Sequence, residues 1–225
     1  MKETAKLIAA IRYPLIFIAV LWGIKIVENA AGIRLTVLGI YPLHVKGIPG
    51  ILFAPLIHND HVHLFTNTGP LLILGTALFY FYRVIALRLT ALAWLMTGLW
   101  VWFGGREAWH IGSSGLIYSM ASFLFISGFI RKSIELMALS FIVVFLYGGM
   151  LWGVFPLREG VSWESHLMGA IAGIVLAVYY RDEGPQRKKY SWELEEEEEV
   201  LEEAKKEELD ESRQKDQESP GNYSQ

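Results

Sequence analysis

The sequence contains no cysteine, and its first 180 residues contain a single aspartate, Asp60. The absence of cysteine excludes disulfides, thiolate nucleophiles and cysteine-ligated zinc. One aspartate in that part of the chain cannot form a catalytic pair of aspartates. No phosphate-binding glycine loop and no basic patch with interleaved aromatic residues is present, so nucleic acid is not expected as a partner.

Charge is scarce over most of the chain and concentrated at its end. Residues 1–180 hold 12 basic and 7 acidic side chains, whereas residues 181–225 hold 8 basic and 16 acidic ones. The first part is about 62% apolar, well above the usual share for a soluble domain. The sequence therefore predicts a membrane domain over residues 1–181. It also predicts an acidic, charged cytoplasmic tail over residues 182–225, either an exposed helix or disordered.

Long uncharged runs fill the membrane domain, and a helix needs about 20 apolar residues to cross the hydrocarbon core. The runs are 13–24 (extended toward residue 31), 64–82, 89–105, 108–130, 136–157 and 165–180. We therefore expect an all-α membrane protein built as a bundle of six transmembrane helices. With six spans, eleven basic residues near the span ends fall on one side and five on the other. This asymmetry predicts that the N- and C-termini are both cytoplasmic.

Three polar residues lie at a similar depth when each is measured from the cytoplasmic end of its own span. Ser114, His166 and Asn67 are 15 to 17 residues from these ends, which corresponds to roughly 22–25 Å of helix. Polar side chains at that depth are costly unless they face the bundle interior or a wet cavity. They are therefore candidate functional residues near the outer, non-cytoplasmic side.

The first candidate motif is Gly112-Ser113-Ser114-Gly115, which opens the fourth predicted span. A serine in the first turn of a helix lies beside free backbone N–H groups, which would stabilise an oxyanion. Ser114 is the expected nucleophile and Ser113 the competing one. The alternative is that these small residues only begin a closely packed helix.

The second candidate motif places His166 above Gly169 and Gly173 in the last span. Small residues on the fourth span match this face, and two such faces allow helix backbones to approach closely. His166 would then come within hydrogen-bond reach of Ser114 and act as its base. The alternative is a histidine satisfied by packing alone. The small residues of the fourth span are Gly115, Ser119 and Ser122.

The third candidate motif opens the second span. His63 and Asn67 are four residues apart and so share one helix face. Both can donate hydrogen bonds, which suits the second wall of an oxyanion hole. The alternative is a zinc or copper site formed by His58, His61 and His63, although no H-E-x-x-H run accompanies them.

Together these motifs resemble the rhomboid intramembrane serine proteases in their six-helix form, over about residues 10–181. The resemblance implies that Ser114 is the nucleophile and His166 its general base. It assigns the oxyanion hole to His63, Asn67 and the Ser114 backbone N–H, and it places the catalytic imidazole on Tyr118. The motif residues expected to support this site are His58, Gly112, Gly115, Gly169 and Gly173.

Two departures from the family pattern concern the surroundings of the site. The Trp-Arg pair common in the first outer loop of the family is not evident, and Arg34 or Arg106 is the candidate substitute. Ser165 stands where the family usually has alanine before the histidine. Neither position bears on the proposed chemistry.

The resulting prediction is a serine endopeptidase that hydrolyses peptide bonds in transmembrane substrates with a Ser-His dyad and no cofactor. Its partners would be transmembrane proteins and the lipid bilayer, and its site would open toward the non-cytoplasmic side of a cell or inner membrane. Two alternatives stay open: a noncatalytic rhomboid-like protein that binds client proteins, and a histidine-rich metal-binding membrane protein.

Overall fold

The computed structural model describes residues 3–146, 152–157, 160–185 and 191–218. The chain divides into two compact units, residues 1–186 and residues 187–225. Every regular element of the described residues is a helix, and one isolated backbone bridge is present. The expectation of an all-α protein is confirmed.

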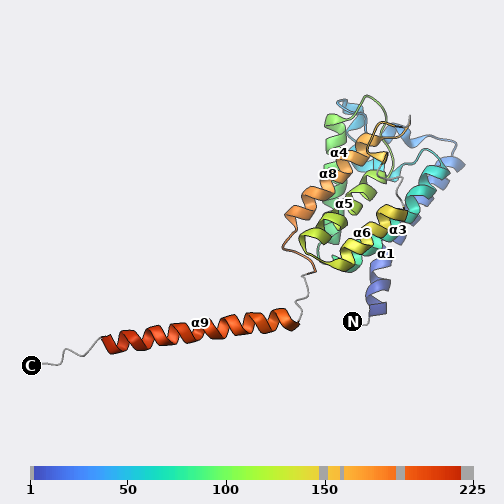
Figure 1. The fold of residues 1–225 in the computed structure, drawn as a ribbon. Coiled ribbons are helices and arrows are strands. Elements are labelled where there is room, and N and C mark those ends of the chain that lie inside the picture. The colour runs from blue at the N-terminus through green and yellow to red at the C-terminus, as the bar shows by residue number, and fades with distance from the viewer. Residues whose placement is uncertain (1–2, 147–151, 158–159, 186–190, 219–225) are drawn as a thin grey trace, which may run out of the picture. The chain divides into compact units, whose positions relative to one another are not determined.

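The helices of the first unit match the predicted apolar runs (Figure 1). Three of them, α1, α3 and α4, are long and apolar enough to cross a membrane, and α5 and α8 are shorter apolar helices of 17 residues each. The second part of the fifth run includes residues 147–151, which lie outside the described residues. The helices are α1 (Glu3–Ala30), α3 (His61–Phe81), α4 (Ala86–Gly104), α5 (Ser114–Ile130), α6 (Ile134–Leu146) and α8 (Trp163–Tyr179).

Helix α5 lies at the centre of this unit and contacts α3, α4, α6 and α8 (Figure 1). Its contact with α8 is a backbone contact made possible by glycines. A Cβ atom added at Gly169 would lie 2.1 Å from the Gly115 carbonyl oxygen, and one added at Gly173 would lie 2.2 Å from the Ser119 carbonyl oxygen. Any larger side chain would separate the two helices, so the predicted small-residue faces do meet.

The linker between α1 and α3 is built of short helical turns and reaches the loop between α4 and α5. Ile40 and His110 exchange backbone hydrogen bonds of 2.9 and 2.8 Å, which form the isolated bridge. This bridge fixes the connection that leads into Ser114. The linker turns are η1 (Leu35–Leu38), η2 (Val45–Gly47), α2 (Gly50–Phe53) and η3 (Ala54–Leu56).

In the second unit, the described residues 191–218 form the helix α9 (Ser191–Glu218). Five consecutive glutamates, residues 195–199, lie in its first half and are exposed.

Candidate active site

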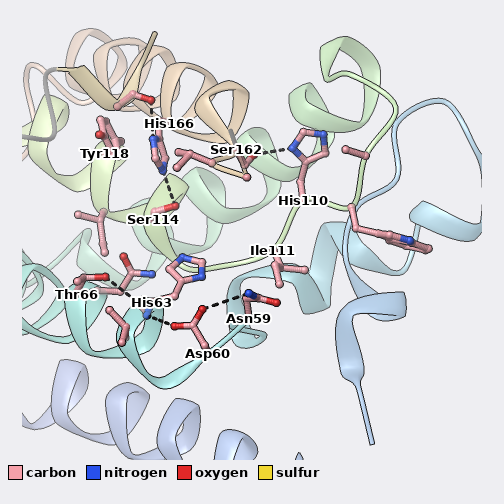
Figure 2. Close-up of a pocket in the computed structure, with 18 of the residues that line it drawn as sticks. Asn59, Asp60, His63, Thr66, His110, Ile111, Ser114, Tyr118, Ser162 and His166 are labelled. Atoms are coloured by element: carbon pink, nitrogen blue, oxygen red, sulfur yellow. Dashed lines mark hydrogen bonds between the residues drawn. The ribbon is translucent and has the colours of Figure 1, made fainter. Parts of the chain in front are cut away.

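Ser114 and His166 are joined by a hydrogen bond between two helices. Ser114 is the first residue of α5 and is 9% exposed, and His166 lies in the first turn of α8. The distance from Ser114 Oγ to His166 Nε2 is 2.8 Å, and Figure 2 shows the two side chains turned toward each other. This is the geometry in which a hydroxyl donates its proton to a neighbouring base.

The other ring nitrogen of His166 fixes the tautomer. His166 Nδ1 lies 2.8 Å from the carbonyl oxygen of Gly153. A carbonyl oxygen only accepts, so Nδ1 carries the proton and Nε2 is free to accept from Ser114. The ring also stacks on Tyr118, with centroids 4.3 Å apart and planes 10° apart.

Tyr118 was expected beneath the imidazole, but Gly153 was missed because a backbone carbonyl has no side-chain signature. The available signal was a glycine inside the fifth apolar run, which often marks a close backbone approach. A Cβ at Gly153 would lie 2.0 Å from the Tyr118 hydroxyl oxygen and 3.0 Å from His166 Nδ1.

Helix α3 carries the two candidate oxyanion donors. Its N-terminus is capped by Asp60, whose carboxylate accepts the backbone N–H of His63 at 2.8 Å. This hydrogen bond lowers the pKa of Asp60, so the cap is ionised at neutral pH. Asn67 is 7% exposed, and its amide nitrogen has no hydrogen-bond partner in the described part of the chain. A buried donor without a partner is costly, and it is available to an oxyanion.

Gly112 lies against both donors. It has a φ of +108°, which favours glycine. A Cβ atom here would lie 2.9 Å from His63 Nε2 and 3.9 Å from Asn67 Nδ2. Gly112 lies two residues before Ser114. Because it has no side chain, there is room for the His63 ring beside it.

His58 and Ser113 form a separate buried pair behind the candidate site. Ser113 Oγ lies 3.1 Å from His58 Nε2, and the two residues are 0% and 2% exposed. Burial lowers the pKa of His58 from its usual value to about 3, so its ring is neutral. The His58 ring packs edge-on against His63 at 5.0 Å between centroids. The Ser113 hydroxyl is hydrogen-bonded to His58, and the Ser114 hydroxyl is the one that contacts the His166 imidazole.

The three histidines of the alternative metal site have different partners. His61 lies 2.7 Å from the Asn29 amide nitrogen and stacks on Trp22, away from the His58–His63 contact. Among the residues that the structure describes, no group of three His, Asp or Glu side chains is arranged to hold a metal ion.

An open cavity of about 1290 Å³ connects the candidate residues. Helix α3 forms one side, and residues 152–157 and 160–162 contribute to another. It is larger than a typical small-molecule pocket of roughly 300–1,000 Å³. The predicted site residues that line it are His63, Asn67, Ser114, Tyr118 and His166.

The two arginines considered for the first outer loop differ in their surroundings. Arg34 is exposed on the linker that follows α1. Arg106 lies between α4 and α5, lines the cavity and forms an ion pair with the buried Glu164. Ser165 Oγ lies 2.6 Å from Ser162 Oγ, so the residue that departs from the family pattern has a hydrogen-bond partner.

The apolar helices, with a cavity among them, are those of an integral, multi-pass membrane protein. Residues 47–183 match the Rhomboid domain. The chain is 39% identical over 184 residues to the uncharacterized protein Rv1337 of Mycobacterium tuberculosis, covering 77% of this chain and 75% of that protein. It is 35% identical over 191 residues to the uncharacterized protein ML1171 of Mycobacterium leprae, covering 77% and 72% respectively. The chain belongs to the rhomboid family, as the motifs indicated.

Proposed function

We propose that this chain is an intramembrane serine protease with a Ser114–His166 dyad. The observation that carries the proposal is the 2.8 Å contact between Ser114 Oγ and His166 Nε2, with the opposite ring nitrogen held by Gly153. A histidine that served only in packing would have no reason to direct the lone pair of Nε2 at a serine in the first turn of a helix.

The reaction proceeds through an acyl-enzyme. His166 Nε2 takes the Ser114 proton as Oγ attacks the scissile carbonyl, and the bond to the leaving amine breaks as His166 donates that proton to it. A water molecule then attacks the ester while His166 removes its proton. The proton returns to Ser114 as the new carboxyl group leaves, so the chain is regenerated without a cofactor.

The oxyanion of each tetrahedral intermediate is bound by donors from α5 and α3. The Ser114 N–H is at the start of a helix, where backbone donors have no intrahelical acceptor. The Asn67 amide supplies an unused donor, and His63 supplies a ring N–H. Loss of one such donor typically lowers kcat by about 10²–10³-fold.

The substrates are transmembrane segments of other proteins. A scissile carbonyl inside a membrane helix is hydrogen-bonded along that helix, so the segment must unwind before Ser114 can attack. Segments with helix-breaking residues near their outer end are therefore the preferred substrates. The cavity beside α3 has the volume to receive such an unwound stretch.

The proposed topology follows from the basic residues. Both termini lie in the cytoplasm, the cavity opens toward the other side, and residues 182–225 form a cytoplasmic tail outside the membrane domain. Eleven basic residues near the span ends on the terminal side, against five on the other, support this orientation.

The test is labelling of the full chain by a fluorophosphonate probe, followed by peptide mapping. We expect covalent label on Ser114, none in Ser114→Ala, and retained label in Ser113→Ala. An unlabelled parent chain that still holds client proteins would contradict the proposal in favour of a noncatalytic binding protein. Tight zinc binding that is lost in His58→Ala and His61→Ala, with function intact in Ser114→Ala, would favour the metal-binding alternative.

A further inference from the structure

The loop that leads to Ser114 holds the start of the helix that carries His166. Arg106 Nη1 lies 3.1 and 3.2 Å from the two carboxylate oxygens of Glu164. Arg106 Nη2 donates a 2.8 Å hydrogen bond to the Val161 carbonyl oxygen. We call the Arg106–Glu164 pair the outer clamp. Arg106 lies eight residues before Ser114 in sequence, and Glu164 lies two residues before His166.

The two side chains of the outer clamp differ in how deeply they are buried. Glu164 is 2% exposed, whereas the Arg106 side chain is 45% exposed at the rim of the cavity. A buried carboxylate requires a cation and hydrogen-bond donors around it. Arg106 supplies both, because its guanidinium reaches the two oxygens and its backbone N–H lies 3.4 Å from one of them.

A second connection joins the same two segments. His110 Nε2 donates to the Arg106 carbonyl oxygen at 3.0 Å, and burial lowers the pKa of His110, so the ring is neutral. Its Nδ1 therefore accepts from the Ser162 hydroxyl at 2.6 Å, a contact drawn in Figure 2. Ser162 Oγ in turn accepts from Ser165 Oγ.

The backbone contact between α5 and α8 does not by itself set the direction of the His166 ring. The glycines of this face fix the separation of the two helices. The side-chain hydrogen bond across the same face, from Ser122 Oγ to the Ala170 carbonyl oxygen at 2.8 Å, lies a full helical turn beyond His166. A guanidinium–carboxylate pair is directional and fixes rotation and register. The outer clamp supplies this constraint within one helical turn of His166.

We infer that Arg106 and Glu164 are positioning residues that hold His166 in line with Ser114. This inference rests on the proposed protease function. Without the clamp, the first turn of α8 can rotate, and the His166 ring leaves the line of the Ser114 hydroxyl. Misplacement of a catalytic group by about 1 Å can cost about 100-fold in rate.

The experiment measures fluorophosphonate labelling of the full chain as a function of probe concentration, so that KI and kinact are separated. Glu164→Gln removes the negative charge of the carboxylate. Arg106→Lys keeps a positive charge but removes the two guanidinium nitrogens that contact Glu164 and Val161. Both are expected to lower kinact by about 10- to 100-fold with KI nearly unchanged. Because one contact is involved, the double variant should be no slower than the slower single variant.

A matched control acts on the opposite end of the same helix. Arg131 donates from Nη2 to the Tyr180 carbonyl oxygen at 2.6 Å, where α8 ends. Arg131→Lys should lower the thermal stability and leave kinact of the folded protein at the parent value. Arg106→Lys tests the clamp without requiring a change at the buried carboxylate.

Two results would overturn the positioning role alone. One is a parent-like kinact in Glu164→Gln and Arg106→Lys, and the other is an equal fall of kinact in Arg131→Lys, which would mean general loosening of α8. A parent chain that takes no label at Ser114 would instead overturn the proposed function, and the positioning role with it.

Discussion

The carbonyl oxygen of Gly153 accepts a 2.8 Å hydrogen bond from His166 Nδ1, at the position where a serine protease triad has a carboxylate. A neutral carbonyl orients the ring and selects its tautomer, but it offers the imidazolium less electrostatic stabilisation than an ionised acid. The stacking of the ring on Tyr118 adds to this orientation. This arrangement defines a dyad whose alignment depends on backbone placement.

Gly153→Ala should therefore impair the dyad. The added Cβ would lie 2.0 Å from the Tyr118 hydroxyl oxygen, so either Tyr118 or the Gly153 carbonyl must move. We expect labelling of Ser114 to slow by at least about tenfold, because both contacts that orient His166 are displaced. Gly23→Ala is the control, since a Cβ at Gly23 meets no atom within 4 Å. Equal labelling rates in both variants would contradict the role of the Gly153 carbonyl.

Asn67→Ala should lower kcat by about 10²–10³-fold with little change in KM, because the amide acts on the oxyanion and not on the bound substrate. The measurement is steady-state cleavage of a transmembrane peptide in detergent. Thr76→Val on the same helix is the matched control, because Thr76 Oγ1 is also buried without a partner among the described residues. A rise in KM with kcat preserved would assign Asn67 to substrate binding instead.

The buried His58 should make stability depend on pH. In the folded chain burial holds the pKa of His58 at about 3, against an ordinary value of 6.5. The unfolded chain thus binds more protons between these values, so stability is complete above pH 6.5 and falls as the pH drops. Between pH 6.5 and 5 the free energy of unfolding should fall by about 1.6 kcal/mol.

Thermal unfolding at several pH values tests this dependence. His58→Gln should flatten the slope without removing it, because burial also lowers the pKa of His110. His44→Gln, at an exposed histidine, should keep the parent slope. The same slope in His58→Gln as in the parent would show that His58 does not contribute.

Lys25 is expected to stabilise the contact between α1 and the segment that precedes α3. It forms a 2.8 Å ion pair with Glu28 and donates to the carbonyl oxygens of His58 and Asn59, just before α3 begins. Both side chains of the pair are under 10% exposed, at 7% and 6%. Lys25→Met would leave a buried carboxylate unpaired and should cost about 3–5 kcal/mol.

The matched control is Lys6→Met. Lys6 forms the same type of i,i+3 pair with Glu3 on α1, but with side chains 45% and 69% exposed. An exposed pair contributes about 0–1 kcal/mol, so Lys6→Met should have little effect in the same chemical unfolding experiment. Similar losses for the two variants would contradict the stabilising role of the buried pair.

The proposed membrane orientation can be tested directly because the chain has no cysteine. Glu107→Cys lies on the loop between α4 and α5, and Asp182→Cys follows α8; both native residues are exposed. A membrane-impermeant maleimide should label the Glu107→Cys variant in intact cells. It should label the Asp182→Cys variant only after the cells are permeabilised. The parent chain reports background labelling. The reverse pattern would invert the topology and leave the site chemistry unaffected.

The sequence by itself determined the helices and the candidate chemical groups. Apolar runs fix where helices form, and the spacing of Gly169 and Gly173 indicates a face for close packing. These signals are local, because burial in lipid and helix periodicity act on neighbouring residues. The family match over residues 47–183 agrees with them.

Only the tertiary structure decided how those groups are oriented. The His166–Gly153 contact joins residues 13 apart in sequence, and the Arg106–Glu164 contact joins residues 58 apart. One partner in the first contact is a backbone carbonyl, which every residue possesses. The second contact depends on the loop after α4 meeting the first turn of α8. No local pattern distinguishes such partners, since they become unique only when packed helices bring them within hydrogen-bond distance.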